Sequence, residues 1–133
     1  MREILFRGKD IQGEWIEGKL LYFKANVGTD ELAIIVAGCE WDNSKEWFNL
    51  GKRAYVIPET IGQYTGLTDK NGKKIFEGDI VKHSIGTFVV KFLNGTFCCS
   101  LIEDDYLTDL CSIHNQCEII GNIHDNPELL KGE

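Results

Sequence analysis

Two Asn-Gly dipeptides constrain the fold of this chain more than any other feature of its sequence. Asn94-Gly95 lies between two runs of β-branched and aromatic residues, and Asn71-Gly72 lies between shorter apolar flanks. Asn-Gly readily takes the positive backbone angles that a tight hairpin turn requires. The sequence therefore predicts two antiparallel hairpins.

Other apolar and aromatic runs have the length and composition of strands. They cover residues 4–9, 13–23, 32–39, 54–57 and 117–123. Several short strands joined by Gly-containing turns are typical of an antiparallel β protein. We therefore predict a mainly β fold. In the C-terminal half, the strands from Asp79 to Cys99, closed by the strand near Ile119, are expected to curl into a small, partly open barrel.

One to three short helices are expected between the strands. Residues 45–50 follow the capping sequence Asp42-Asn43-Ser44 and precede Gly51, which predicts one or two helical turns. The acidic segment 104–110 is either a loop or one helical turn. Asn126-Pro127 starts a third, short helix, because proline is favoured at the first helical position.

At 133 residues the chain is long enough for one compact domain, with a possible boundary between two lobes near 40–53. It contains no apolar run close to the ~20 residues that cross a bilayer, so no membrane partner is expected. Charges occupy the first seven positions and no apolar signal core follows them. These features predict a cytoplasmic protein.

Acidic residues outnumber basic ones, giving a net charge of −7 and a pI of about 5.0. This balance disfavours nucleic acid as a partner, because phosphates are bound mainly through Lys and Arg. A local lysine patch is the alternative: Lys70, Lys73 and Lys74 surround the first Asn-Gly turn. Binding of nucleic acid through this patch competes with its interpretation as a solvated hairpin tip.

Three tryptophans allow a second kind of surface. Trp15, Trp41 and Trp47 could form an aromatic platform for single-stranded nucleic acid. Such residues are more often part of a core or the anchor of a subunit interface. The sequence favours the latter interpretation.

The segment 56–81 gathers polar side chains around two glycines. Its candidate partner-binding residues are Glu59, Gln63, Thr65 and Asp79, together with the lysines of the hairpin tip. They could form a recognition edge for a partner. Alternatively they cap turns and satisfy backbone amides between strands, which is the interpretation the sequence favours.

Metal and catalytic patterns are weak in this sequence. Cys111, His114 and Cys117 have a ligand-like spacing, with a fourth zinc ligand available from Cys98, Cys99 or His124. Paired Cys-x-x-Cys motifs are missing, however. In the calcium-like run 69–72 the glycine comes too early for a calcium loop. We therefore expect no catalytic residues, no metal and no cofactor, and keep a small metal-dependent enzyme as an alternative.

Three blocks of the chain, in order, resemble the YopX-like family of phage and prophage proteins. These are residues 2–9 with Trp15 and Gly18 after them, the central segment 56–81, and the closing segment 119–130. The resemblance implies a β-rich fold with a barrel-like portion, a phage-encoded intracellular protein and self-association. It carries over no set of catalytic residues.

From these observations we predict a non-enzymatic binding or assembly module that forms a homo-oligomer. Its partner would be a host or phage protein. Nucleic-acid association through the lysine patch is the first alternative to this function, and metal-dependent catalysis is the second.

Overall fold

A computed structural model describes residues 4–24, 31–42, 47–104 and 106–131. The chain divides into two compact units, one spanning Glu3–Gln63 and the other Tyr64–Glu133. The division falls after Gln63 rather than near 40–53. Residues 40–42 pair with residues 47–49 in one antiparallel ladder, so this part of the chain lies within the first unit.

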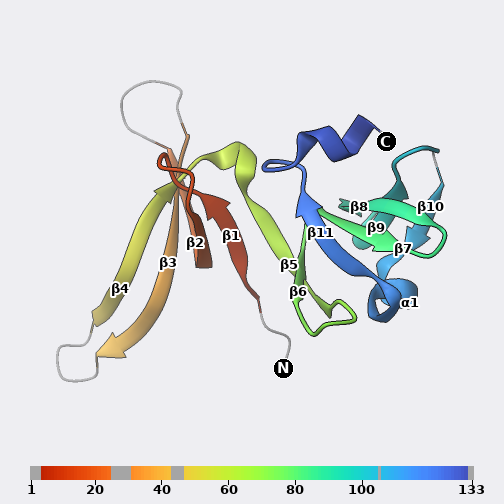
Figure 1. The fold of residues 1–133 in the computed structure, drawn as a ribbon. Coiled ribbons are helices and arrows are strands. Elements are labelled where there is room, and N and C mark those ends of the chain that lie inside the picture. The colour runs from red at the N-terminus through yellow and green to blue at the C-terminus, as the bar shows by residue number, and fades with distance from the viewer. Residues whose placement is uncertain (1–3, 25–30, 43–46, 105, 132–133) are drawn as a thin grey trace. The chain divides into compact units, whose positions relative to one another are not determined.

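The first unit is an antiparallel sheet with the strand order β4-β3-β2-β1-β5 (Figure 1). Its elements are β1 (Phe6–Lys9), β2 (Trp15–Lys24), β3 (Glu31–Asp42), β4 (Trp47–Val56), the 3-10 turn η1 (Pro58–Thr60) and the start of β5 (Gly62–Thr68). Pro58 follows β4 closely and begins η1, as its fixed backbone angle and missing N–H would suggest. The strands predicted at 4–9, 13–23, 32–39 and 54–57 are confirmed.

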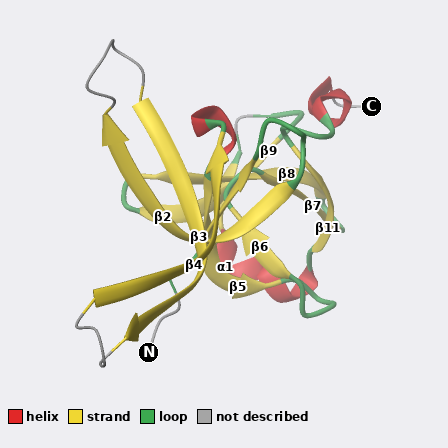
Figure 2. Ribbon diagram, turned by 90° about the vertical axis from the view of Figure 1, so that its left-hand side faces the viewer, coloured by secondary structure: helices red, strands yellow, loops and turns green. Residues whose placement is uncertain are grey.

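The second unit holds a sheet with the order β10-β9-β8-β7-β11. Its elements are β6 (Lys74–Phe76), β7 (Asp79–His83), β8 (Gly86–Leu93), β9 (Thr96–Leu101), β10 (Leu107–Asp109), α1 (Leu110–Ile113), η2 (His114–Gln116), β11 (Glu118–Asn122) and η3 (Pro127–Lys131). The fold is mainly antiparallel β, as predicted, and strands dominate Figure 2.

The expected barrel is not closed. In the described part of the second sheet, β10 and β11 are the two ends of the strand order, and β11 pairs with β7. After β10 the chain enters α1 and η2, which lead it to the β7 edge. The predicted contact between the strand near Ile119 and the rest of the sheet is therefore correct, but it extends an open sheet.

The two hairpins predicted from Asn-Gly are both present. Leu93 and Thr96 are cross-strand partners, so β8 and β9 are joined by two residues alone. Both of these, Asn94 with φ 52° and Gly95 with φ 79°, have the positive angles of a type I′ turn. The other hairpin joins β5 to β6 through a longer, five-residue loop, 69–73.

The helix predicted over 45–50 is wrong. Residues from Trp47 onward belong to β4, and this strand pairs with β3 as far as the partners Asp42 and Trp47. Cross-strand pairing has overridden the local capping signal, because aromatic and branched residues also suit a strand. The capping residues Asn43 and Ser44 lie outside the described residues.

The two other helix predictions are met in part. The segment 104–110 contains a strand, β10, and its helical turn starts later, at Leu110, where the Asp109 carboxylate accepts a hydrogen bond from the N–H of Cys111 at 3.3 Å. Pro127 opens a turn as predicted, but the turn is of the 3-10 type. Along the described chain, no helix has the length and apolar character of a membrane span.

Each unit has its own apolar cluster. In the second unit the buried members are Ile75, Val81, Phe88, Val90, Phe97, Cys99, Leu110 and Cys117. In the first unit Ile35 and Val56 are buried against Phe6, Ile16, Leu20 and Ile61. Alternation along β8 directs Phe88 and Val90 into the cluster and turns Val89 to the opposite face of the sheet.

Candidate functional site

Two of the polar residues singled out in the central segment are buried and bonded within the second unit. The hydroxyl of Thr65 donates to the carbonyl of Ile75 at 2.8 Å and accepts from the N–H of Leu67 at 3.2 Å. Asp79 is 2% exposed, and its carboxylate accepts from the N–H of Phe76 at 2.8 Å. The Asp79 bond satisfies a backbone group at the turn between β6 and β7, whereas Thr65 lies within β5 and bonds across to β6.

Two other candidates belong to the first unit. Glu59 is exposed in η1, and Gln63 is half-buried and pairs through its backbone with Phe6. The neighbouring Thr60 hydroxyl donates to the carbonyl of Ile57 at 2.6 Å and accepts from the N–H of Lys9 at 2.8 Å. The four polar candidates are thus divided between the two units, with one pair in each.

Asp69, which the sequence presented only as the start of a calcium-like run, is a structural residue. It is 5% exposed, and its Oδ1 accepts from the backbone N–H groups of Asn71 and Lys73, each at 2.9 Å. Its Oδ2 accepts from the N–H of Ile119 at 3.1 Å. The side chain therefore fastens the β5–β6 hairpin to β11. The five-residue pattern Asp-x-x-Gly-x was the available signal.

The electrostatics of Asp69 follow from these contacts. Burial by itself raises the pKa of the carboxyl group. Three backbone N–H donors and the nearby ammonium group of Lys73 outweigh burial, so the pKa lies below its ordinary value of 3.8. The ionised carboxylate is therefore the form that the fold stabilises.

The hairpin has further bonds to the segment that contains the expected metal ligands. His114 Nδ1 lies 2.7 Å from the carbonyl oxygen of Thr68, and so donates a hydrogen bond to it. The N–H of Lys70 donates to the carbonyl of Cys117 at 2.9 Å. The His114 side chain and the Cys117 carbonyl therefore hold the hairpin against the segment that follows α1.

The thiols of this region are mainly core groups. Cys99 and Cys117 are fully buried, and burial raises the pKa of both, that of Cys99 to about 12. A thiol in this state is a poor nucleophile. Cys111 is exposed. Within the described residues, no group of three or more His, Cys, Asp and Glu side chains is close enough to hold a metal ion.

The three lysines of the hairpin tip are exposed, as expected. Lys70 Nζ lies 3.7 Å from a carboxylate oxygen of Glu118. Lys74 Nζ lies 5.5 Å from the centre of the Tyr64 ring. Lys73 is close enough to Asp69 to lower the pKa of that carboxyl group. Each cation thus has an anionic or aromatic neighbour within the second unit.

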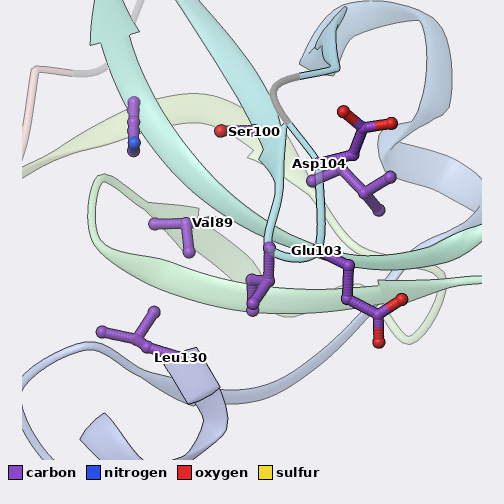
Figure 3. Close-up of a pocket in the computed structure, with 8 residues that line it drawn as sticks. Val89, Ser100, Glu103, Asp104 and Leu130 are labelled. Atoms are coloured by element: carbon purple, nitrogen blue, oxygen red, sulfur yellow. The ribbon is translucent and has the colours of Figure 1, made fainter. Parts of the chain in front are cut away.

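The outer face of the second sheet carries a surface pocket of about 440 Å³ (Figure 3). Its lining comes from β8, β9, the loop after β9, and η3. The lining residues are Val89, Lys91, Ser100, Leu101, Ile102, Glu103, Asp104 and Leu130. A pocket of this size falls within the range of sites for small ligands and for side chains of a partner.

Strand register explains the base of the pocket. Val89 on β8 is the direct cross-strand partner of Ser100 on β9. Lys91, two residues beyond Val89, lies on the same face of the sheet. Leu130 in η3 and Glu103 in the loop after β9 form part of the pocket wall. In Figure 3 the carboxylates of Glu103 and Asp104 lie at one side of the view, and Val89 and Leu130 lie at the other.

This arrangement suits a mainly polar ligand that has a small apolar part. Most of the exposed lining is polar, Val89 and Leu130 add a small apolar part, and the Ser100 hydroxyl can donate or accept a hydrogen bond. The pocket was not predictable from the sequence, because its lining residues, such as Val89 and Leu130, come from segments far apart in the chain.

Comparison with known proteins supports the assignment made from the sequence. The family model described as "YopX protein" matches residues 5–131. The chain therefore belongs to the YopX family. The same comparison covers both compact units and the pocket lining, so all the features described above lie within the family domain.

A solved structure shares the fold. The crystal structure of protein EF1440 from Enterococcus faecalis is similar, with a TM-score of 0.66 and 24% sequence identity. The similarity covers 98% of this chain and 99% of that chain. At this level of identity it shows a common fold alone. None of the curated proteins compared with this sequence matches it.

Proposed function

We propose that this YopX-family protein is a non-enzymatic binding module whose second unit holds a segment of a partner protein in the pocket on the β8–β9 face. The observation that carries the proposal is the pocket itself, whose mainly polar lining includes Lys91, Glu103 and Asp104, with a small apolar part from Val89 and Leu130. Polar groups placed in a pocket fix the orientation of the group that binds there.

The charges of the lining favour a basic side chain on the partner. Two carboxylates, Glu103 and Asp104, stand against one ammonium group, Lys91. The stem of a lysine or arginine side chain can cover apolar surface while its charged end reaches a carboxylate. The net charge of −7 would also attract a basic partner over a longer range.

Affinity capture with matched variants tests this proposal. The bait would be the wild-type protein, Glu103→Lys in the pocket, or Glu59→Lys in the first unit; both glutamates are exposed, so neither change should disturb folding. The lysate would come from bacteria that carry a prophage, since the family resemblance implies a phage-encoded, cytoplasmic protein. Quantitative mass spectrometry would measure what each bait retains.

We expect a protein partner that wild type and Glu59→Lys retain equally, and that Glu103→Lys retains about tenfold less, as for a reversed charge at an interface. Equal retention by Glu103→Lys would contradict the pocket as the contact site. Loss with Glu59→Lys in place of Glu103→Lys would move the contact to the central segment.

Self-association is a second part of the proposal, supported by the β10 edge. Leu101 donates its N–H to the carbonyl of Tyr106 at 2.9 Å, so by antiparallel alternation the backbone groups of Leu107 point away from β9. Leu107 is also 51% exposed. An edge strand with an exposed apolar residue is a surface on which a second copy can add its own strand.

Light scattering coupled to size-exclusion chromatography tests this assembly. We expect an oligomer of the wild type at micromolar concentration and a smaller species for Leu107→Lys, because a lysine on an edge strand discourages pairing. A wild-type protein that is monomeric at that concentration would contradict self-association.

A further inference from the structure

The sheet of the first unit has an outer face that differs in charge from the rest of the protein. Phe6, Ile16 and Leu20 face the apolar cluster around Ile35. Because side chains alternate along a strand, the residues between them occupy the other face. These are Arg7 and Lys9 on β1, with Trp15, Glu17 and Lys19 on β2.

The register places these residues side by side. Lys9 is the cross-strand partner of Trp15, and Arg7 is the partner of Glu17. The guanidinium carbon of Arg7 lies 4.7 Å from the centre of the Trp15 ring, and Lys9 Nζ lies 5.6 Å from it. Two cations thus gather around one indole ring, within the range of cation–π attraction.

Trp15 is half-buried on this face, away from the apolar cluster of the unit. The structure therefore weakens the interpretation of this tryptophan as a core residue. The adjacent Lys19 is exposed, and its Nζ donates to the carbonyl of Ile4 at 2.9 Å. This bond uses one of the three ammonium donors and leaves the positive charge in place.

The local balance of charge is opposite to that of the whole chain. Over the full sequence, 21 acidic residues outnumber 14 basic ones. On this face of β1 and β2, three cations accompany a single carboxylate, that of Glu17. A positive surface with an aromatic ring at its centre is the combination that proteins use to bind single-stranded nucleic acid on the open face of a sheet.

We propose that this face, defined by Arg7, Lys9, Trp15 and Lys19 and called the β1–β2 cationic face, binds single-stranded nucleic acid. Phosphates lie against the three cations, and a base stacks at the Trp15 ring or on the planar guanidinium group of Arg7. Neither step changes a covalent bond. The proposal is independent of the pocket in the second unit, since the two surfaces belong to different units.

An unpaired strand fits this face better than a duplex does. Reading a duplex requires a helix, a ribbon or a loop that enters a groove. A pleated sheet face instead offers stacking surface to bases that are already exposed. The lysines of the β5–β6 hairpin tip are a weaker candidate, because Lys70 and Lys73 lie in the loop 69–73 and not on the face of a sheet.

Fluorescence anisotropy with labelled oligothymidylate of about 20 nucleotides tests the proposal, since one sheet-type site covers about 4–16 nucleotides. The proteins compared would be the wild type, Lys9→Glu, Trp15→Leu and, as the matched control, Lys73→Glu at the exposed hairpin tip. Affinity would be measured over a series of salt concentrations. Circular dichroism would establish that each variant is folded.

We expect binding by the wild type that weakens as salt rises. Trp15→Leu should reduce affinity about tenfold with an unchanged salt slope, because it removes stacking and leaves the phosphate contacts. Lys9→Glu should reduce both affinity and the slope, by about 0.7 for each lost contact to a single strand. Lys73→Glu should behave as the wild type.

Three results would overturn this assignment. Wild-type protein that fails to bind at about 100 µM in low salt, the weak end of non-specific binding, would remove nucleic acid as a ligand. An equal loss of affinity in Lys73→Glu would place the contact at the hairpin tip. Competition by polyglutamate as strong as that by unlabelled oligothymidylate would show a general site for acidic polymers.

Discussion

Two turns, one in each unit, are built in the same way. One begins at Asp10 and joins β1 to β2; the other begins at Asp69 and joins β5 to β6. In each, the glycine three residues on donates its N–H to the aspartate carbonyl, at 3.1 Å for Gly13 and 3.0 Å for Gly72. Both glycines have positive φ angles, 84° and 80°.

The aspartate side chains repeat the same bonds. The Oδ1 atoms of Asp10 and Asp69 accept from the backbone N–H groups two and four residues further on, at 2.9 Å in all four cases. These bonds mimic a backbone turn, which is why Asp suits the first position. The local sequence pattern is therefore sufficient to form the turn in either unit.

The two turns differ in what surrounds them. The bonds of Asp10 lie in an exposed turn, whereas Asp69 is 5% exposed and bonds also to the N–H of Ile119 on β11. The same motif thus closes a local turn in the first unit, whereas in the second it also acts as a tertiary fastener, a bond between the hairpin and a distant strand. A pattern that resembles an ion-binding loop in sequence acts at Asp69 as a clamp for backbone N–H groups.

The largest expected effect is that of Asp69→Ala. The change removes the acceptor of three backbone N–H groups, two in the hairpin loop and one, that of Ile119, on β11. Each of these partly buried donors loses a charged acceptor at a cost of about 1 kcal/mol, so we expect the free energy of unfolding of the second unit to fall by about 3 kcal/mol. Urea denaturation followed by circular dichroism measures this loss.

Asp10→Ala is the matched control for that substitution. It removes the same two local bonds, but water can reach the freed N–H groups, so we expect a loss of about 1 kcal/mol or less. Equal losses for Asp10→Ala and Asp69→Ala would contradict the distinction between a local turn and a tertiary fastener.

The pH dependence of stability should separate the two turns further. The pKa of Asp69 is lower in the folded protein than its ordinary value of 3.8, so the stabilisation is complete above that value and is lost as the pH falls through the folded-state pKa. The stability gap between the wild type and Asp69→Asn should therefore shrink below about pH 4. Urea midpoints at several pH values measure it, and a gap that is constant with pH would contradict this account.

The smallest effects are expected at the glycines. Gly13→Ala and Gly72→Ala each place a methyl group at a positive φ angle, and for both the added atom would have no neighbour within 4 Å. The cost is therefore backbone strain alone, about 1 kcal/mol at each position. Equal losses in urea denaturation are expected; a much larger loss for Gly72→Ala would show that the turn itself, as well as its aspartate, differs between the units.

Much of the strand pattern was predictable from sequence, because it depends on local chemistry. Asn94-Gly95 specifies its turn through the backbone angles that these two residues accept. The helix predicted over 45–50 was wrong because the capping signal is local, whereas the pairing of Trp47 with Asp42 depends on the neighbouring strand β3. The open sheet was not predictable either, because the sequence does not show which edge of the sheet β11 pairs with.

The candidate sites were less predictable than the fold. Thr65 and Asp79 were noted as polar residues of the central segment, but their burial depends on packing that is not visible in the local sequence. The place of Trp15 on the outer face follows from the register between β1 and β2. The pocket brings Val89 near Leu130 only after the chain has folded. Surfaces that combine distant segments were therefore the part that sequence could not supply.

Amide hydrogen exchange at Ile119 tests most directly whether Asp69 fastens the hairpin to β11. The N–H of Ile119 donates to Asp69 Oδ2 at 3.1 Å, so it reports on this single bond from the other side of the contact. Our account predicts that this amide is protected in the wild type and exchanges much faster in Asp69→Ala, with Asp10→Ala unchanged. The same protection in the wild type and in Asp69→Ala would contradict it.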